Sequence, residues 1–206
     1  RFGVAKRLQL IKGLLFLEKD LLFASTEKRG FYKLNMKTGQ LDTFGFKVGN
    51  VEEYYLAMYG MERLNDNEIL VGTLSFGLIK FNVAKGTFSW PKGVLQKREG
   101  ILFNTVNQIR KDHAGRFWVT SNYFRLAEYL PEYDSVVTRQ PDPYSHYGFD
   151  DNNASCVYED RQHNIWIGTS LNGSYHFNPN RKRVQFFSEN DFVPGALQKG
   201  KVFSIA

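Results

Sequence analysis

The chain repeats itself with a period of about 48 residues, and this constrains its fold more than any other feature. The segment NIWIGT (164–169) recurs as RFWVTS (116–121) and EILVGT (68–73), and more faintly as LLFAST (21–26). The last residues of these four segments are 47, 48 and 48 positions apart, and the flanking columns align without gaps. Such self-similarity predicts a repeat architecture, in which each unit buries its apolar face against its neighbours.

Within each repeat the pattern of residues is typical of β-strands. In the fourth repeat, runs rich in alternating apolar, β-branched and aromatic residues are separated by turns containing Gly, Asn, Asp and Pro. These runs are 155–159, 165–169, 174–177 and 184–187. An α-solenoid is the alternative fold, but its helices would need amphipathic runs of about ten residues, and none is evident. We therefore expect an all-β fold, a β-propeller with about four consecutive four-stranded antiparallel blades.

The repeat register also predicts the blade boundaries. Closed propellers have about four to eight blades. Because the sequence opens on Arg1 without a methionine and stops inside an apparent strand, we expect a fragment that forms an arc of a larger ring of the seven-bladed type. The expected units are a tail of a preceding blade (1–9), blade 1 (10–48), blade 2 (49–96), blade 3 (97–144), blade 4 (145–192) and the start of a next blade (193–206).

Several repeat columns are expected to be structural. Trp118 and Trp166 occupy equivalent second strands and should both be largely buried between sheets. A glycine opens the third strand of three repeats, where φ is expected to be positive. Arg125 breaks this column, so blade 3 should have an altered loop there. The structural repeat residues are Trp118, Trp166, Gly72, Thr73, Gly168, Thr169, Asp112 and Asp160.

The third and fourth repeats resemble a known family. The fourth reads CVYEDRQHNIWIGTSLNGSYHFNPNRKRVQFF and the third begins NQIRKDHAGRFWVTSN. Both look like the regulator-propeller (two-component regulator propeller) repeat. Asp160 and Asp112 match its aspartate, and Gly115 matches its turn glycine, whereas His163 departs from that glycine. Leu17 and Leu64 stand where the first two repeats would have the aspartate.

This resemblance implies a role in sensing. Such repeats are similar to the periplasmic sensor region of hybrid two-component histidine kinases in gut Bacteroidetes. There, two propellers precede a β-sandwich, a membrane span, a histidine kinase and often a receiver with a DNA-binding domain. The implied function is detection of oligosaccharides and control of glycan-utilisation genes, in a full-length homodimer. The alternatives are a non-catalytic scaffold for protein–protein interaction and, third, a carbohydrate-active enzyme propeller.

Composition excludes several other functions for this segment. The net charge of +6 could suit an anionic partner, but the basic residues are scattered, and the one dense run (181–183) falls in an expected turn. We therefore expect no nucleic-acid binding. No run of about 18 apolar residues is present, so we expect no membrane contact. The lone Cys156 excludes an internal disulfide framework, and an inert buried thiol is expected there.

The acidic and imidazole side chains do not form a catalytic or metal-binding pattern by spacing. Glu159, Asp160, Glu132 and Asp134 could supply a glycosidase pair, but we expect Asp160 and Asp112 to accept turn N–H groups instead. The histidines show no metal-like pair, so we expect no catalysis, no metal and no cofactor. They are His113, His146, His163 and His176.

The connections between second and third strands are expected on the same face of the propeller as the segments that join successive blades, and we call this the loop face. It offers the best candidates for ligand binding, because loops on a rigid scaffold usually carry binding groups. The segment QPDPYSHYGFDDNN (140–153) combines aromatic rings that could stack on sugars with short polar side chains that could bind hydroxyls. The alternative is that these aromatics fill the groove between blades or contact a neighbouring domain. The candidate ligand-binding residues are Tyr144, His146, Tyr147, Phe149, Asp150, Asp151 and Asn152, with Asn122, Tyr123 and Arg125 from the loop before them.

Overall fold

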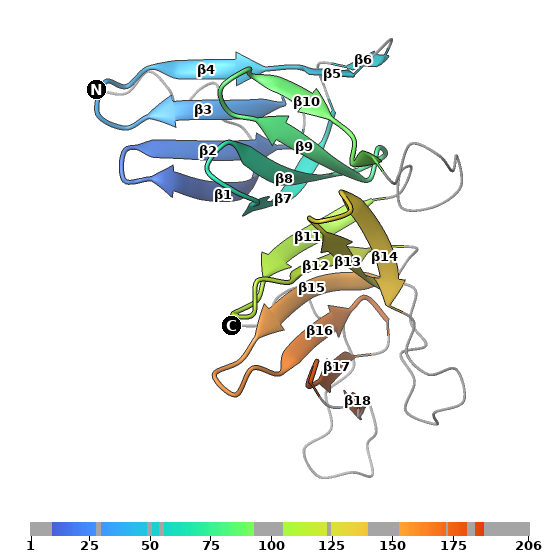
Figure 1. Cartoon of the computed structure of the whole chain (residues 1–206). Coiled ribbons are helices and arrows are strands. Elements are labelled where there is room, and N and C mark those ends of the chain that lie inside the picture. Colours follow the sequence, from blue (N-terminus) through green and yellow to red (C-terminus); the bar gives the residue numbers. More distant parts are fainter. Residues whose placement is uncertain are drawn as a thin grey trace.

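The structure is a computed structural model that describes residues 10–27, 30–48, 51–53, 56–92, 105–122, 125–139, 153–171, 173–180 and 184–187. These residues form four four-stranded antiparallel sheets and one two-stranded ribbon (Figure 1). In each large sheet the strands pair in chain order. Over the described ranges no helix is long and apolar enough to cross a membrane. The predicted all-β propeller arc is therefore confirmed.

Each four-stranded sheet is one blade. Blade 1 contains β1 (Ile11–Glu18), β2 (Leu21–Thr26), β3 (Phe31–Asn35) and β4 (Leu41–Phe44). The ribbon of β5 (Phe46–Val48) and β6 (Val51–Glu53) precedes blade 2, which contains β7 (Met58–Arg63), β8 (Glu68–Thr73), β9 (Leu78–Asn82) and β10 (Thr87–Ser89). Blade 3 contains β11 (Val106–Lys111), β12 (Phe117–Ser121), β13 (Arg125–Leu130) and β14 (Ser135–Arg139). Blade 4 contains β15 (Ala154–Glu159), β16 (Ile165–Thr169), β17 (Ser174–Phe177) and β18 (Val184–Phe187).

The core lies between the blades, because the second strand of a blade buries both of its faces. In β8, Ile69 and Val71 pack toward blade 1, while Leu70 packs toward blade 3. Successive side chains of a strand point to opposite faces, so the continuous run of apolar residues in β8 serves two interfaces at once. The interface between blades 3 and 4 is built the same way, around Trp118 and Ile167.

A β-bulge recurs at the same repeat position in every innermost strand. The strand register shifts at Lys12, at Tyr59 with Gly60, at Asn107 and at Ser155. A bulge adds a residue to one strand and redirects its side chain. The sequence pattern did not reveal these bulges, since an added residue leaves the apolar columns of the repeat intact.

One face of blade 1 exposes an apolar side chain whose repeat equivalents in blades 3 and 4 are buried. Leu14 is 58% exposed, although the equivalent residues Ile109 and Val157 are only 2% and 3% exposed. Those two residues contact the preceding blade. The exposed face of β1 therefore has the composition of a blade interface, as expected of an arc.

The two tryptophans occupy equivalent positions but differ in burial. Trp118 is 3% exposed and packs edge-to-face on Phe177 of blade 4, with ring centroids 5.5 Å apart. Trp166 is only half-buried and stacks on His176, at 4.6 Å. Both indoles are therefore mostly buried, as predicted, but Trp166 is less covered than Trp118. Its face of blade 4 points away from blade 3, so blade 3 does not cover it.

The glycines that open the third strands have the expected backbone conformation. Gly30, Gly77 and Gly173 have φ of 85°, 66° and 85°. Each carbonyl accepts a hydrogen bond from the backbone N–H of the threonine four residues earlier, which closes the turn. In blade 3 the equivalent Arg125 pairs with Ser121 in the strand ladder. The loop at 123–124, where an altered conformation is predicted, lies outside the described residues.

Candidate functional site

A cavity of about 380 Å³ lies between the innermost strands of the four blades, β1, β7, β11 and β15. Its polar lining comes from both charged and neutral side chains, among them Lys12, Glu62, Asn107, Arg110 and Ser155. Bulge positions of all four blades, Lys12, Gly60, Asn107 and Ser155, contribute to this lining. The cavity is the place where the fold itself gathers hydrogen-bonding groups from every blade.

The bulge side chains are held by the loops that follow each second strand. Lys12 Nζ lies 2.9 Å from Glu27 Oε2, and this hydrogen bond outweighs burial to raise the pKa of the Lys12 amine. At the equivalent place in blade 4, the hydroxyls of Ser155 and Ser170 are 2.8 Å apart. The bulge thus joins the cavity wall to the loop face in each of these blades.

Contacts between blades fix the same wall. Asn107 Nδ2 donates to the Ala154 carbonyl at 2.8 Å, and Gln108 Oε1 accepts the Val157 N–H at 2.7 Å. Backbone groups of blade 4 thus orient the amide N–H donor of Asn107 and the amide oxygen acceptor of Gln108. These bonds hold both side chains in fixed orientations in the cavity wall.

Among the sequence-predicted ligand residues, Asn122 is the one whose side chain the structure describes. Its Oδ1 accepts from Asn107 Nδ2 at 2.7 Å, and its backbone N–H donates to the Thr105 carbonyl at 3.2 Å. Asn122 therefore joins the bulge of blade 3 to the loop face. The structure describes the backbone of Arg125 but not its side chain. The other predicted ligand residues lie outside the described residues: Tyr123, Tyr144, His146, Tyr147, Phe149, Asp150, Asp151 and Asn152.

The repeat aspartates organise the turns between first and second strands. Asp160 Oδ1 accepts the Asn164 N–H at 2.8 Å, and its Oδ2 accepts Trp166 Nε1 at 2.8 Å. Burial opposes ionisation, but these hydrogen bonds dominate and lower the pKa of Asp160 to about 2. Asp112 makes the same bonds to Arg116 N–H and Trp118 Nε1, at 2.9 and 3.0 Å. The indole bond was not foreseen, because only the fold brings the second strand over the turn.

Another carboxylate of the sequence set has a structural partner. Asp134 lies 2.8 Å from Lys80 Nζ of blade 2 and accepts the Tyr129 hydroxyl at 2.7 Å. Burial is again outweighed by the hydrogen bonds from Lys80 and Tyr129, so the pKa of Asp134 is lowered. Asp134 thus joins blades 2 and 3, an interaction over 54 positions of sequence.

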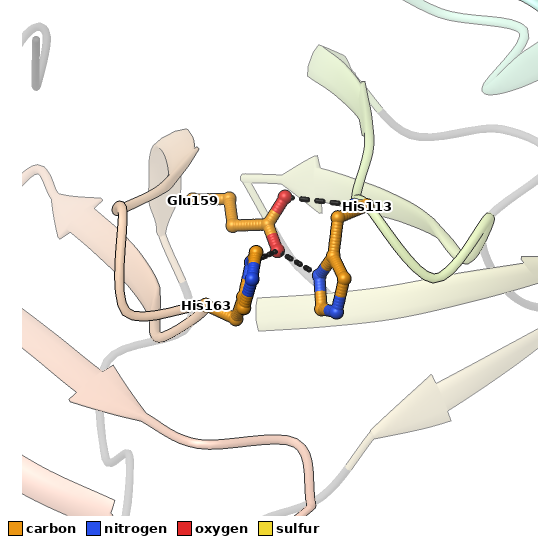
Figure 2. Close-up of side chains that lie close together, drawn as sticks. All are labelled: His113, Glu159 and His163. Atoms are coloured by element: carbon orange, nitrogen blue, oxygen red, sulfur yellow. Dashed lines mark hydrogen bonds and ion pairs between the residues drawn. The ribbon is translucent and has the colours of Figure 1, made fainter.

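Sequence spacing failed for two of the histidines. His113 and His163, placed in separate turns without a metal-like pairing, stack on each other with ring centroids 3.5 Å apart. Figure 2 shows the Glu159 carboxylate beside both rings. Their spacing in the sequence does not predict this pairing. His113 and Glu159 are 46 positions apart, and only the stacking of blades 3 and 4 brings them together.

Comparison with known proteins agrees with this architecture. Residues 148–170 match the family model described as two component regulator propeller, so the predicted resemblance is confirmed. Among curated proteins, none matches the chain in sequence.

Solved structures share the fold over most of the chain. Two are extracellular domains of hybrid two component systems from B. thetaiotaomicron, BT3049 and BT4673, with TM-scores of 0.72 and 0.71 and identities of 16% and 19%. Each match covers 95% of this chain but 24% of the other. Virginiamycin B lyase from Staphylococcus aureus matches with a TM-score of 0.62 at 9% identity, over 86% of this chain and 55% of the lyase. The chain thus spans about a quarter of those two extracellular domains.

Proposed function

From the two-component regulator propeller repeat at residues 148–170, we propose that this chain is a ligand-sensing propeller segment of a hybrid two-component sensor. In this proposal the segment is extracytoplasmic, in the periplasm, and itself performs no catalysis. The full-length chain is a histidine kinase, and further propeller and β-sandwich domains of the same chain pack beside this arc. The observation that carries the proposal is the family match on a blade whose complete four-stranded form the structure describes.

The proposed ligand is an oligosaccharide released by polysaccharide breakdown. Sugars present hydroxyls and apolar ring faces, so their recognition needs fixed polar groups together with aromatic surfaces. The cavity wall supplies fixed polar groups, since Asn107 and Ser155 are held by the loop face. The segment 140–152 supplies Tyr144 and Tyr147 as the proposed stacking surfaces. Ligand binding then changes transcription of glycan-utilisation genes by shifting the balance between two arrangements of the receptor dimer.

The test is a transcriptional reporter driven by the full-length sensor in its own cell. The double variant Tyr144→Ala/Tyr147→Ala should lose the response to the inducing glycan while the protein level stays unchanged. Tyr133→Ala is the matched control, because Tyr133 is also a tyrosine, is 70% exposed and lies in the turn after β13. If the double variant responds as Tyr133→Ala does, the 140–152 segment does not bind the ligand. This arc would then be a scaffold for protein–protein interaction.

A further inference from the structure

Three metal-ligating side chains from two blades converge at the ends of the innermost strands. Glu159 ends β15, His163 lies in the turn that follows it, and His113 lies in the equivalent turn of blade 3. Figure 2 shows one carboxylate oxygen facing both imidazole rings. Glu159 Oε1 lies 3.1 Å from His163 Nδ1 and also contacts His113 Nδ1. The three ligand atoms all lie within 4.8 Å of one another.

A hydrogen bond to one oxygen of the Glu159 carboxylate fixes its orientation, and the other oxygen faces the two imidazole rings. Glu159 Oε2 accepts the backbone N–H of His113 at 2.8 Å. The remaining oxygen, Oε1, is therefore directed at the two rings. An outer bond that orients a ligand in this way is typical of metal sites.

The backbone at His163 is an independent observation. His163 has φ of 62°, in the left-handed region that disfavours residues with a Cβ. The equivalent residue of blade 3 is Gly115, with φ of 85°. A side chain at this position costs stability relative to glycine, and such strain is concentrated at functional sites. Here the strained residue is the one that places a second imidazole nitrogen beside Glu159.

We propose that His113 Nδ1, His163 Nδ1 and Glu159 Oε1 bind one divalent transition-metal ion, with Zn²⁺ as the best fit. Imidazole and carboxylate are the usual ligands of zinc, at bond lengths of about 2.0–2.2 Å in a tetrahedron. Ligand atoms of such a tetrahedron are about 3.3 Å apart, close to the 3.1 Å between His163 and Glu159. The other two edges of the triangle need rotation of the imidazole rings of His113 and His163, whose side chains are 39% and 50% exposed.

The ion would tie blades 3 and 4 together at the turns that follow β11 and β15. Three protein ligands leave a fourth position, which water fills because the histidines are half-exposed. The bound ion replaces the direct contact between Glu159 and the two rings. Since the ligands come from both blades, binding to the folded arc stabilises the interface between them.

The proposal is tested by titrating the purified chain with ZnCl₂ in a calorimeter and by following its melting temperature. We expect saturable binding of one ion and a rise in melting temperature with Zn²⁺ concentration. His163→Gly restores the glycine of the repeat, so it should fold at least as well as the wild type yet bind about tenfold more weakly or worse. Glu159→Gln keeps an oxygen for the His113 N–H but removes the anionic ligand, and it should weaken binding similarly.

The control is Arg161→Ala, which changes an exposed residue of the same turn and should bind Zn²⁺ as the wild type does. Absence of saturable binding would overturn the proposal. It would also be overturned if His163→Gly kept full affinity, or if binding were lost in His146→Ala instead. None of these outcomes depends on the sensor role, because the reporter assay above does not use the metal.

Discussion

The sharpest test of the blade register is the comparison of Trp118→Ala with Trp166→Ala. The two residues occupy the same repeat position, and each indole donates to the aspartate six residues earlier. Trp118 is 3% exposed, whereas Trp166 is half-buried. Removing a fully buried Trp typically costs about 3–5 kcal/mol. Since Asp112 is buried and would lose a donor, with a further cost of about 1–3 kcal/mol, we expect Trp118→Ala to lose about 4–8 kcal/mol.

Trp166→Ala should cost about half as much, because less apolar surface leaves the interior. The measurement is urea unfolding followed by far-UV circular dichroism, with the free energy of unfolding taken from midpoint and slope. Trp118→Phe separates the two contributions, since it keeps most of the apolar contact but removes the N–H donor to Asp112. We expect it to cost about 1–3 kcal/mol. Equal losses for the two alanine variants would refute the assignment of Trp118 to the interface between blades 3 and 4 and of Trp166 to a less covered face.

Three further predictions follow from individual contacts. Asp160→Asn should lower the free energy of unfolding by about 1–2 kcal/mol at pH 7. Because folding lowers the pKa of Asp160 from 3.8 to about 2, the difference in stability between wild type and variant should be complete above pH 4 and be lost as the pH falls through about 2. Urea unfolding across that pH range measures it. Gly72→Ala should cost about 1–3 kcal/mol, since an added Cβ would lie 2.6 Å from the Val106 side chain and 2.7 Å from its carbonyl oxygen; an unchanged melting temperature would contradict this packing. Lys80→Met should cost about 1–3 kcal/mol through the half-satisfied Asp134, and the Lys80→Met/Asp134→Asn double variant should recover part of that loss; purely additive losses would argue against the pair.

Features that depend on local sequence were predictable from the residues. The strand runs of the fourth repeat match β15 to β18 to within one residue. The positive φ of Gly30, Gly77 and Gly173 follows from the turn that each must close. These features could be predicted because strand period, turn chemistry and glycine conformation depend on a few neighbouring residues, and the repeat supplied several copies of the same local pattern.

The candidate sites were harder to predict, because they depend on how the blades stack. Sequence spacing showed no relation between His113 and Glu159, and nothing marked Asn107 as the partner of Asn122. The bulge that redirects Asn107 leaves the hydrophobic pattern unchanged, so its only sequence trace is a polar residue inside an apolar strand. The position of His163 was the one available signal, because it stands where Gly115 stands in blade 3.

The amino-acid sequence by itself determined the repeat, the four-stranded blade and the residues that its core requires. Side-chain period and turn propensity are properties of short segments, and they do not depend on what lies beside them. Only the tertiary structure decided which side chains meet across blades, as Lys80 and Asp134 do over 54 positions. It also decided that Trp118 is covered more completely than Trp166, since burial is set by the neighbouring sheet. The physical reason is that the order of blades follows the chain, while the contacts between them depend on the twist and spacing of whole sheets.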